Sequence, residues 1–164
     1  MDVKIRKATQ DDAEGISQIW EVVCAERIYS AVSTPFTPQQ EREYISSLSE
    51  REGIFIAEIN DKIIGFLSLD LWSKAIDSFK HVCTIGTFIF PEWRGKGISY
   101  ILANHTFEIA KANGYYKIVI YVRKGNERAI KFYQNLGFIL KGELEHQVLI
   151  NGVYENEVFM EKFL

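Results

Sequence analysis

A junction near the middle of the chain carries the residues whose types and spacing are best suited to binding chemistry. An apolar, strand-like run passes through a proline into a turn with glycines and cations, and a helical pattern begins directly after it. In order, this junction consists of Phe88, Ile89, Phe90, Pro91, Glu92, Trp93, Arg94, Gly95, Lys96, Gly97, Ile98 and Ser99. The pattern predicts a site at which backbone N–H groups and positive charge converge.

This turn is suited to an anion, and a diphosphate is the natural ligand. N–H groups in the first turn of a helix lack partners within the helix, and the helix dipole is positive at that end. Gly95 and Gly97 allow the backbone to adopt positive φ and to approach a ligand closely. With Arg94 and Lys96 beside them, these features favour phosphate binding. The alternative is a plain strand-to-helix connection whose glycines serve a tight turn and whose cations are solvated.

Two other phosphate motifs do not fit the spacing. A Walker-type loop requires a lysine followed by serine or threonine after the last glycine, whereas Lys96 precedes Gly97. A dinucleotide fingerprint requires a small residue where Tyr100 stands and an acidic residue at the end of the next strand, where the chain has Arg123. The junction therefore belongs to neither class.

A second motif follows downstream. Residues 126–138 have the pattern of a short helix that Asn126 caps and Gly137 ends, and they come directly after a strand-like run over 117–122. The two motifs read P-x-x-R-G-K-G-I-S and N-x-x-A-x-x-F-Y-x-x-x-G-F. In this order and at this distance they resemble the GNAT superfamily of N-acetyltransferases. The chain is nearest in pattern to its phosphinothricin-type and ribosomal-protein N-terminal branches.

The resemblance implies a cosubstrate and the residues that hold it. The superfamily binds acetyl-CoA with R/Q-x-x-G-x-G/A, which is matched by Arg94, Gly97 and, with a departure from Gly/Ala, Ser99. The resemblance implies that the turn holds the pyrophosphate of acetyl-CoA and that the preceding strand pairs with its pantetheine arm. It implies no metal. The residues assigned to acetyl-CoA in this way are Phe88, Ile89, Phe90, Arg94, Gly95, Lys96, Gly97, Ile98, Ser99 and Asn126. Asn126 can also serve simply as a helix cap.

Tyr133 matches the tyrosine with which many members protonate the departing CoA thiolate, and we predict it to be catalytic. A phenol with a pKa of about 10 can protonate a thiolate with a pKa of about 8.5 only if proximity and local electrostatics assist. The alternative is a ring that packs between helix and sheet. No general base is assigned, because Thr84 stands where many relatives carry a glutamate. The remaining candidates for a base are His81, Glu26, Glu92, His146 and a chain of water molecules.

The resemblance predicts an acetyl-CoA-dependent N-acetyltransferase that acts on a primary amine by direct attack in a ternary complex. The loop over 29–38 is short and aromatic, with Tyr29 and Phe36 as candidate contacts, and it favours a small acceptor over an open peptide groove. The alternatives are an acetyltransferase of protein N-termini and an acyl-CoA-binding sensor without catalysis. The missing glutamate at Thr84 favours the sensor.

Composition narrows the possible partners and the location. With 164 residues, 47% hydrophobic residues and a net charge of −3, the chain shows no basic signal for nucleic acid and no membrane span or leader. Its two cysteines, Cys24 and Cys83, form no C-x-x-C pair, which argues against a zinc site and for a reducing cytoplasm. The long C-terminal strands offer an edge for a homodimer.

These motifs require a mixed α/β fold to position them. Residues 1–164 are predicted to form a single domain, a central mixed and mostly antiparallel sheet of about seven strands flanked by about four helices. Strands are expected over 3–7, 54–59, 63–71, 82–90, 117–122, 140–150 and 153–163, with Asn151-Gly152 joining the last two. Helices are expected around 16–23, 44–48, 98–112 and 126–137. Helix 98–112 is predicted to bury Ile98, Ile101, Leu102, His105 and Ile109, and strand 117–122 to be central and covered on both faces.

Overall fold

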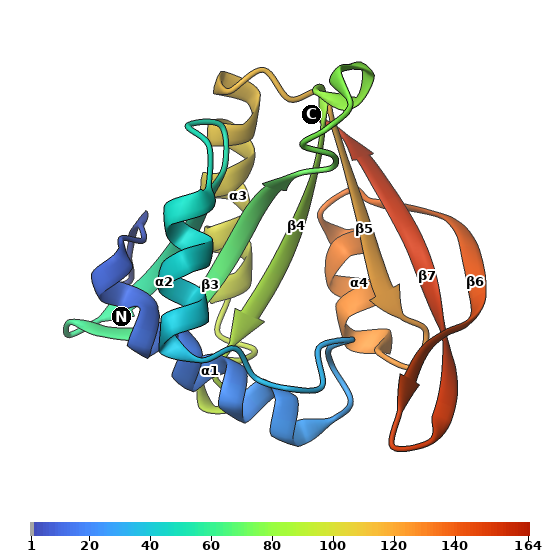
Figure 1. The fold of residues 1–164 in the computed structure, drawn as a ribbon, viewed down its shortest axis with the longest axis horizontal. Coiled ribbons are helices and arrows are strands. Elements are labelled where there is room, and N and C mark those ends of the chain that lie inside the picture. Colours follow the sequence, from blue (N-terminus) through green and yellow to red (C-terminus); the bar gives the residue numbers. More distant parts are fainter. Residues whose placement is uncertain (1) are drawn as a thin grey trace.

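Seven strands form one mixed sheet in the order β1-β2-β3-β4-β5-β7-β6, as the computed structural model shows for residues 2–164 (Figure 1). All neighbouring strands pair antiparallel except β4 and β5, which pair in parallel. The strands are β1 (Lys4–Lys7), β2 (Gly53–Ile59), β3 (Lys62–Leu71), β4 (Val82–Ile89), β5 (Lys117–Arg123), β6 (Ile139–Ile150) and β7 (Val153–Phe163). The α-helices are α1 (Ala13–Glu26), α2 (Pro38–Ser47), α3 (Ile98–Ala112) and α4 (Glu127–Asn135). The predicted mixed α/β fold is confirmed.

Helices cover both faces of the sheet and create two apolar clusters. In Figure 1, α1 and α2 lie over one face and α3 lies behind the other. On the first face, α1 packs Ile16, Ile19 and Trp20 against Phe66 of β3. On the opposite face, side chains of α3 and α4 pack against β2 to β5 and β7 in the larger cluster. Burial of these apolar surfaces is the main force that holds the layers together.

The local turns follow from their sequences. The β6–β7 turn places Asn151 at φ 53° and Gly152 at φ 76°, the left-handed conformation that a two-residue hairpin requires and that these residues tolerate. Helix α2 begins at a complete capping box, in which the Thr37 side chain accepts from the Gln40 amide and the Gln40 side chain accepts from the Thr37 amide. Elements and turns therefore lie close to where the pattern predicts them.

Two predictions about burial were wrong. Helix α3 buries the row Ile98, Leu102, Thr106 and Ala110, together with Ala103 and Phe107. Ile101 is 44% exposed and His105 is exposed, because the helix is turned so that the row at i, i+4 meets the sheet. Strand β5 is internal to the sheet, but it is not covered on both faces, since Tyr121 is 44% exposed.

The parallel pair β4 and β5 opens like a V (Figure 1). The two strands are paired only at Val82–Lys117 and Cys83–Ile118. Beyond these residues they diverge, and the edge of β4 that faces β5 has no strand beside it. None of the helices within residues 2–164 is long and apolar enough to span a membrane.

Candidate active site

A cleft of about 730 Å³ occupies the opening between β4 and β5. One wall is β4 with the turn that follows it, and the other is formed by β5, β7 and α4. Of the predicted site residues, those that line the cleft are Phe88, Ile89, Arg94, Gly95, Gly97, Ser99, Asn126 and Tyr133. The fold therefore brings the two sequence motifs together around one cavity.

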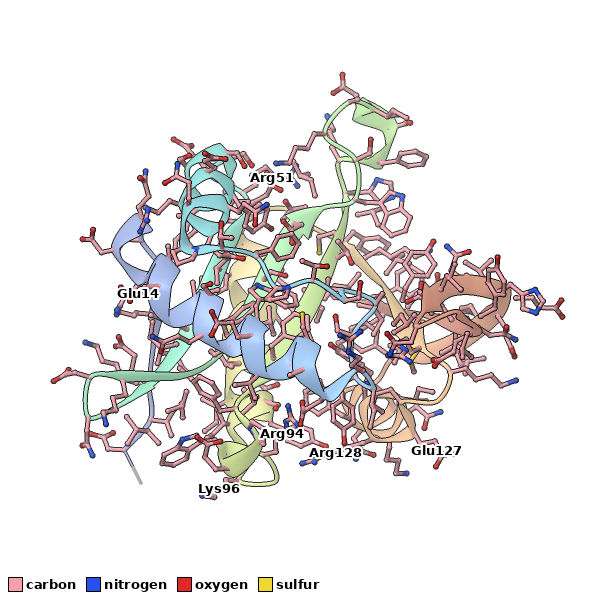
Figure 2. The ribbon with its side chains drawn as sticks, turned by 60° about the horizontal axis from the view of Figure 1, so that its bottom comes forward. Glu14, Arg51, Arg94, Lys96, Glu127 and Arg128 are labelled. Carbon is pink, nitrogen blue, oxygen red and sulfur yellow. The ribbon has the colours of Figure 1, made fainter. Side chains whose placement is uncertain are left out.

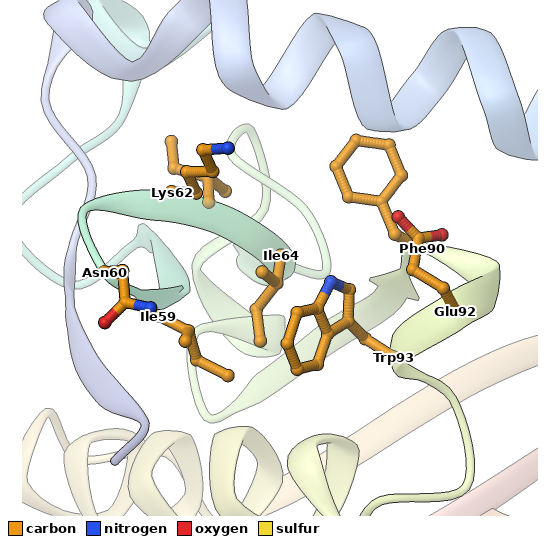
Figure 3. A pocket seen from close by; sticks show the side chains of 8 residues that line it. Ile59, Asn60, Lys62, Ile64, Phe90, Glu92 and Trp93 are labelled. Carbon is orange, nitrogen blue, oxygen red and sulfur yellow. The ribbon is translucent and has the colours of Figure 1, made fainter. Parts of the chain in front are cut away.

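Three predicted cofactor residues lie outside the lining of the cleft. Ile98 is 1% exposed and belongs to the core, where it anchors the start of α3. Lys96 places its ammonium 4.5 Å from the centre of the Trp93 ring. Phe90 lines a separate hollow of about 330 Å³ beside the β2–β3 turn, together with Glu92 and Trp93 (Figure 3).

The open edge of β4 offers backbone groups to an extended ligand. The amide of Phe90 donates to Ile64 of β3, and the carbonyl of His81 accepts from Tyr116 at the paired end of β5. Backbone groups of successive residues in a strand point to alternate sides, so the amides of Thr87 and Ile89 point towards the cleft. An extended amide-bearing chain can pair with them as an additional strand would.

The turn after β4 has the geometry of an anion site. Gly95 and Gly97 adopt φ of 76° and 82°, and Gly97 is the N-cap residue of α3. A Cβ built on Gly97 meets no atom within 4 Å, so the backbone is open to the cleft at this point. The unpaired N–H groups at the start of α3 and its positive dipole end face the same space as Ser99.

The cations around the turn have different surroundings. The Arg94 guanidinium donates to both carboxylate oxygens of Glu26, at 2.8 and 2.7 Å, and its Nε donates to the Ile89 carbonyl at 3.0 Å. Arg94 therefore joins the end of α1 to β4, and its charge is balanced by Glu26. Arg128 and Lys131 of α4 line the cleft, and Arg128 Nη2 lies 3.8 Å from the Cβ position of Gly95. Figure 2 shows Lys96, Arg94 and Arg128 along the same edge of the molecule.

Arg128 and Lys131 were missed by the sequence analysis. Their spacing of i, i+3 places both side chains on one side of α4, and this spacing is the sequence feature that could have identified them. The helix itself was predicted, but the sequence does not show that α4 lies across the cleft from the glycine turn.

Tyr133 is buried against β4. It is 6% exposed, and its hydroxyl donates to Thr87 Oγ1 at 3.3 Å. Burial raises the pKa of the Tyr133 phenol, and the hydrogen bond with Thr87 offsets part of this rise. The phenol therefore keeps its proton near neutral pH and can donate it to an acceptor in the cleft.

Asn126 holds the start of α4 and the loop after α1 together. Its Oδ1 accepts from the Ala129 amide at 3.1 Å, which confirms the predicted helix cap, and its Nδ2 donates to the Tyr29 carbonyl at 3.3 Å. Arg123 secures the same loop by donating to the carbonyls of Arg27 and Ser30. Tyr29 thereby lines the cleft, whereas Phe36 packs on Trp20 with ring centroids 5.3 Å apart.

The candidates for a base are scattered over the molecule. Thr84 lines the cleft, but a hydroxyl cannot take a proton from an ammonium group at neutral pH. Glu26 is engaged by Arg94, and Glu92 lines the separate hollow in Figure 3. His81 is exposed at the paired end of β4, and His146 is exposed on the β6–β7 hairpin.

One carboxylate in the cleft was not foreseen. Glu157 of β7 is the only acidic side chain that lines the cleft within residues 2–164, and it is 8% exposed. It lies opposite Arg123 in the β5–β7 register, a pairing that the sequence pattern does not reveal. The described part of the chain contains no cluster of three or more His, Cys, Asp or Glu side chains that could hold a metal ion.

A glycine turn at a helix N-terminus, a splayed strand pair and a buried tyrosine therefore surround one cleft. Residues 18–138 match the model of the Acetyltransferase (GNAT) family. The chain belongs to this family.

Relatives and solved structures agree with this assignment. The spermidine N(1)-acetyltransferase of Escherichia coli K12 is 33% identical over 123 residues, which cover 72% of this chain and 61% of that protein. The match therefore spans less than two thirds of that relative's length. A phosphinothricin acetyltransferase of Sinorhizobium meliloti in complex with acetyl-CoA has a TM-score of 0.91 and 19% identity, over all of this chain and 89% of that one. A ribosomal-protein-alanine N-acetyltransferase of Brucella melitensis also has a TM-score of 0.91, with 20% identity over 98% and 99% of the two chains.

Proposed function

We propose that residues 1–164 act as one acetyltransferase domain that transfers the acetyl group of acetyl-CoA to a primary amine of a small molecule. One observation carries the proposal, the cleft in which the open edge of β4, the Gly97 turn and the Tyr133 hydroxyl face the same space. The relative named for spermidine and the fold neighbour with acetyl-CoA bound support it.

The reaction follows from the groups around the cleft. The turn over 94–99 and the cations of α4 hold the diphosphate, and the amides of Thr87 and Ile89 bind the pantetheine arm and polarise the acetyl carbonyl. The neutral amine attacks the carbonyl carbon directly in a ternary complex. The C–S bond then breaks, Tyr133 donates its proton to the CoA thiolate, the acylated nitrogen releases its extra proton to water, and water returns a proton to Tyr133.

The loop between α1 and α2 supports a small acceptor. Arg123 and Asn126 hold the loop over the cleft through three hydrogen bonds, at most 3.3 Å long, to the carbonyls of Arg27, Tyr29 and Ser30. A loop secured in this way encloses a compact ligand better than it admits a peptide chain.

An acceptor screen tests the proposal. The protein is incubated with acetyl-CoA and a panel of amines, amino acids and peptides, and released thiol and acetylated product are measured by absorbance and mass spectrometry. We expect acetylation of small amines. Acetylation of peptide N-termini alone would contradict the small acceptor. Tight CoA binding with no thiol release for any acceptor would favour a sensor, which the hydroxyl at Thr84 in place of a carboxylate also favours.

We also propose a homodimer and a cytoplasmic location. Strand β6 is an edge of the sheet, and Ile139, Leu140 and Leu149 on it are between 46% and 61% exposed. Pairing with a second copy would cover this edge and these side chains. Sedimentation velocity at micromolar concentration tests the homodimer, and a single monomeric species would contradict it.

A further inference from the structure

Glu157 is an unusual group in the cleft, because it is largely buried and lacks a partner. No hydrogen bond or ion pair to its carboxylate is found among residues 2–164, although its oxygens are accessible from the cleft. A buried carboxylate without a partner is unfavourable unless a cation or hydrogen-bond donors compensate it. Burial raises the pKa of Glu157, which the charge of Arg123 opposes in part.

Arg123 does not serve as that partner. Its Nε and Nη2 donate to Glu155 at 2.9 and 2.5 Å, and its Nη1 donates to the carbonyls of Arg27 and Ser30. The guanidinium is 5% exposed and its charge is balanced by Glu155. At this wall of the cleft Glu157 therefore offers an uncompensated negative charge, and the neighbouring Arg123 offers no uncompensated positive charge.

We propose that Glu157 binds a protonated nitrogen of the acceptor, so that the preferred substrates are aliphatic diamines and polyamines rather than amino acids. This inference rests on the proposed acetyltransferase function.

The bound nitrogen is the one that does not react. An ion pair with a carboxylate stabilises the ammonium form, whereas the attacking nitrogen must be neutral. Glu157 lies on β7, beyond β5 in the sheet, while the acetyl group is expected against the amides of β4. We therefore expect the acceptor to extend across the opening of the V, with one nitrogen at each wall. An amino acid would direct its carboxylate towards Glu157, and Arg123 has no donor left for it.

Calorimetry tests the binding step without requiring turnover. Putrescine is titrated into the protein saturated with CoA, for the wild type, for Glu157→Gln and for the control Glu145→Gln, which changes an exposed glutamate on β6. We expect putrescine affinity to fall at least tenfold in Glu157→Gln alone, with CoA affinity unchanged in all three proteins. Absent putrescine binding in the wild type, or equal affinity in all three, would overturn the proposal.

Kinetics then test the substrate class. Putrescine and 4-aminobutyrate have the same number of carbons, but a carboxylate in 4-aminobutyrate replaces one terminal aminomethyl group of putrescine. In the wild type kcat/KM should favour putrescine, and Glu157→Gln should raise KM for putrescine at least tenfold while kcat stays within a few fold. If 4-aminobutyrate is the better substrate, the proposal for Glu157 fails while the acetyltransferase function stands. If no amine supports thiol release, the proposed function fails instead.

Discussion

Replacement of Gly97 by aspartate tests the diphosphate site most directly. Gly97 has φ 82°, and a Cβ placed on it meets no atom within 4 Å, so the aspartate side chain enters the space reserved for the ligand. Gly114, just beyond the other end of α3, also has φ 82° and also has no atom within 4 Å of its Cβ position. Gly114→Asp is therefore a control that carries the same charge and the same backbone conformation outside the cleft.

The expected magnitudes separate the two variants. Both pay about 1–2 kcal/mol for a residue with a side chain in the left-handed region. Two unit charges about 5 Å apart interact by about 3 kcal/mol at an effective dielectric constant of about 20. Arg128 and solvent reduce this repulsion at the turn, so we expect a loss of at least tenfold in acetyl-CoA affinity, about 1.4 kcal/mol, for Gly97→Asp alone.

Calorimetry with acetyl-CoA measures the loss, and thermal unfolding without ligand measures the shared cost of strain. We expect Gly114→Asp to bind acetyl-CoA like the wild type. Unchanged affinity in Gly97→Asp would remove the diphosphate from this turn. An equal loss in both variants would show that α3 is perturbed as a whole and would refute the electrostatic reasoning.

Three further predictions address the acid, the helix cap and the buried carboxylates. Tyr133→Phe should lower kcat by about 10²-fold or more with acetyl-CoA affinity unchanged, and a near-normal kcat would mean that the ring only packs. Asn126→Ala should lower the free energy of unfolding by about 1 kcal/mol in urea melts, because it removes the cap on the Ala129 amide, and an unchanged midpoint would contradict this. Burial raises the pKa of Glu41 from 4.5 to about 7, so folded protein holds a proton that the unfolded chain releases between these values. Stability should therefore fall from pH 5 to pH 8, by up to about 3 kcal/mol from Glu41, with Asp70 adding in the same direction because burial raises its pKa to about 6. Glu41→Gln should reduce this slope in urea melts at the two pH values, and an equal slope in both proteins would refute it.

Much of the fold and part of the site could be predicted from the sequence. The period of the apolar residues, the hairpin at Asn151-Gly152 and the cap at Asn126 are local signals, and each depends on residues only a few positions apart. The glycine turn before α3 is also local, because positive φ and a helix N-terminus are properties of a short segment. For the same reason the two motifs sufficed to predict the family and the fold.

The tertiary structure decided which charges are free to act. Arg94 lines the cleft, and α1 brings Glu26 to it and balances its charge, which the sequence does not reveal. Arg123 is balanced by Glu155, while Glu157, two positions further on β7, has no partner among the described residues. These differences arise from contacts between residues far apart in the chain, and the strength of an interaction between charges depends on distance and burial in space. The sequence by itself determined the elements and the glycine turn, whereas only the packing of α1, β5 and β7 around the V left Glu157 in the cleft without a partner among residues 2–164.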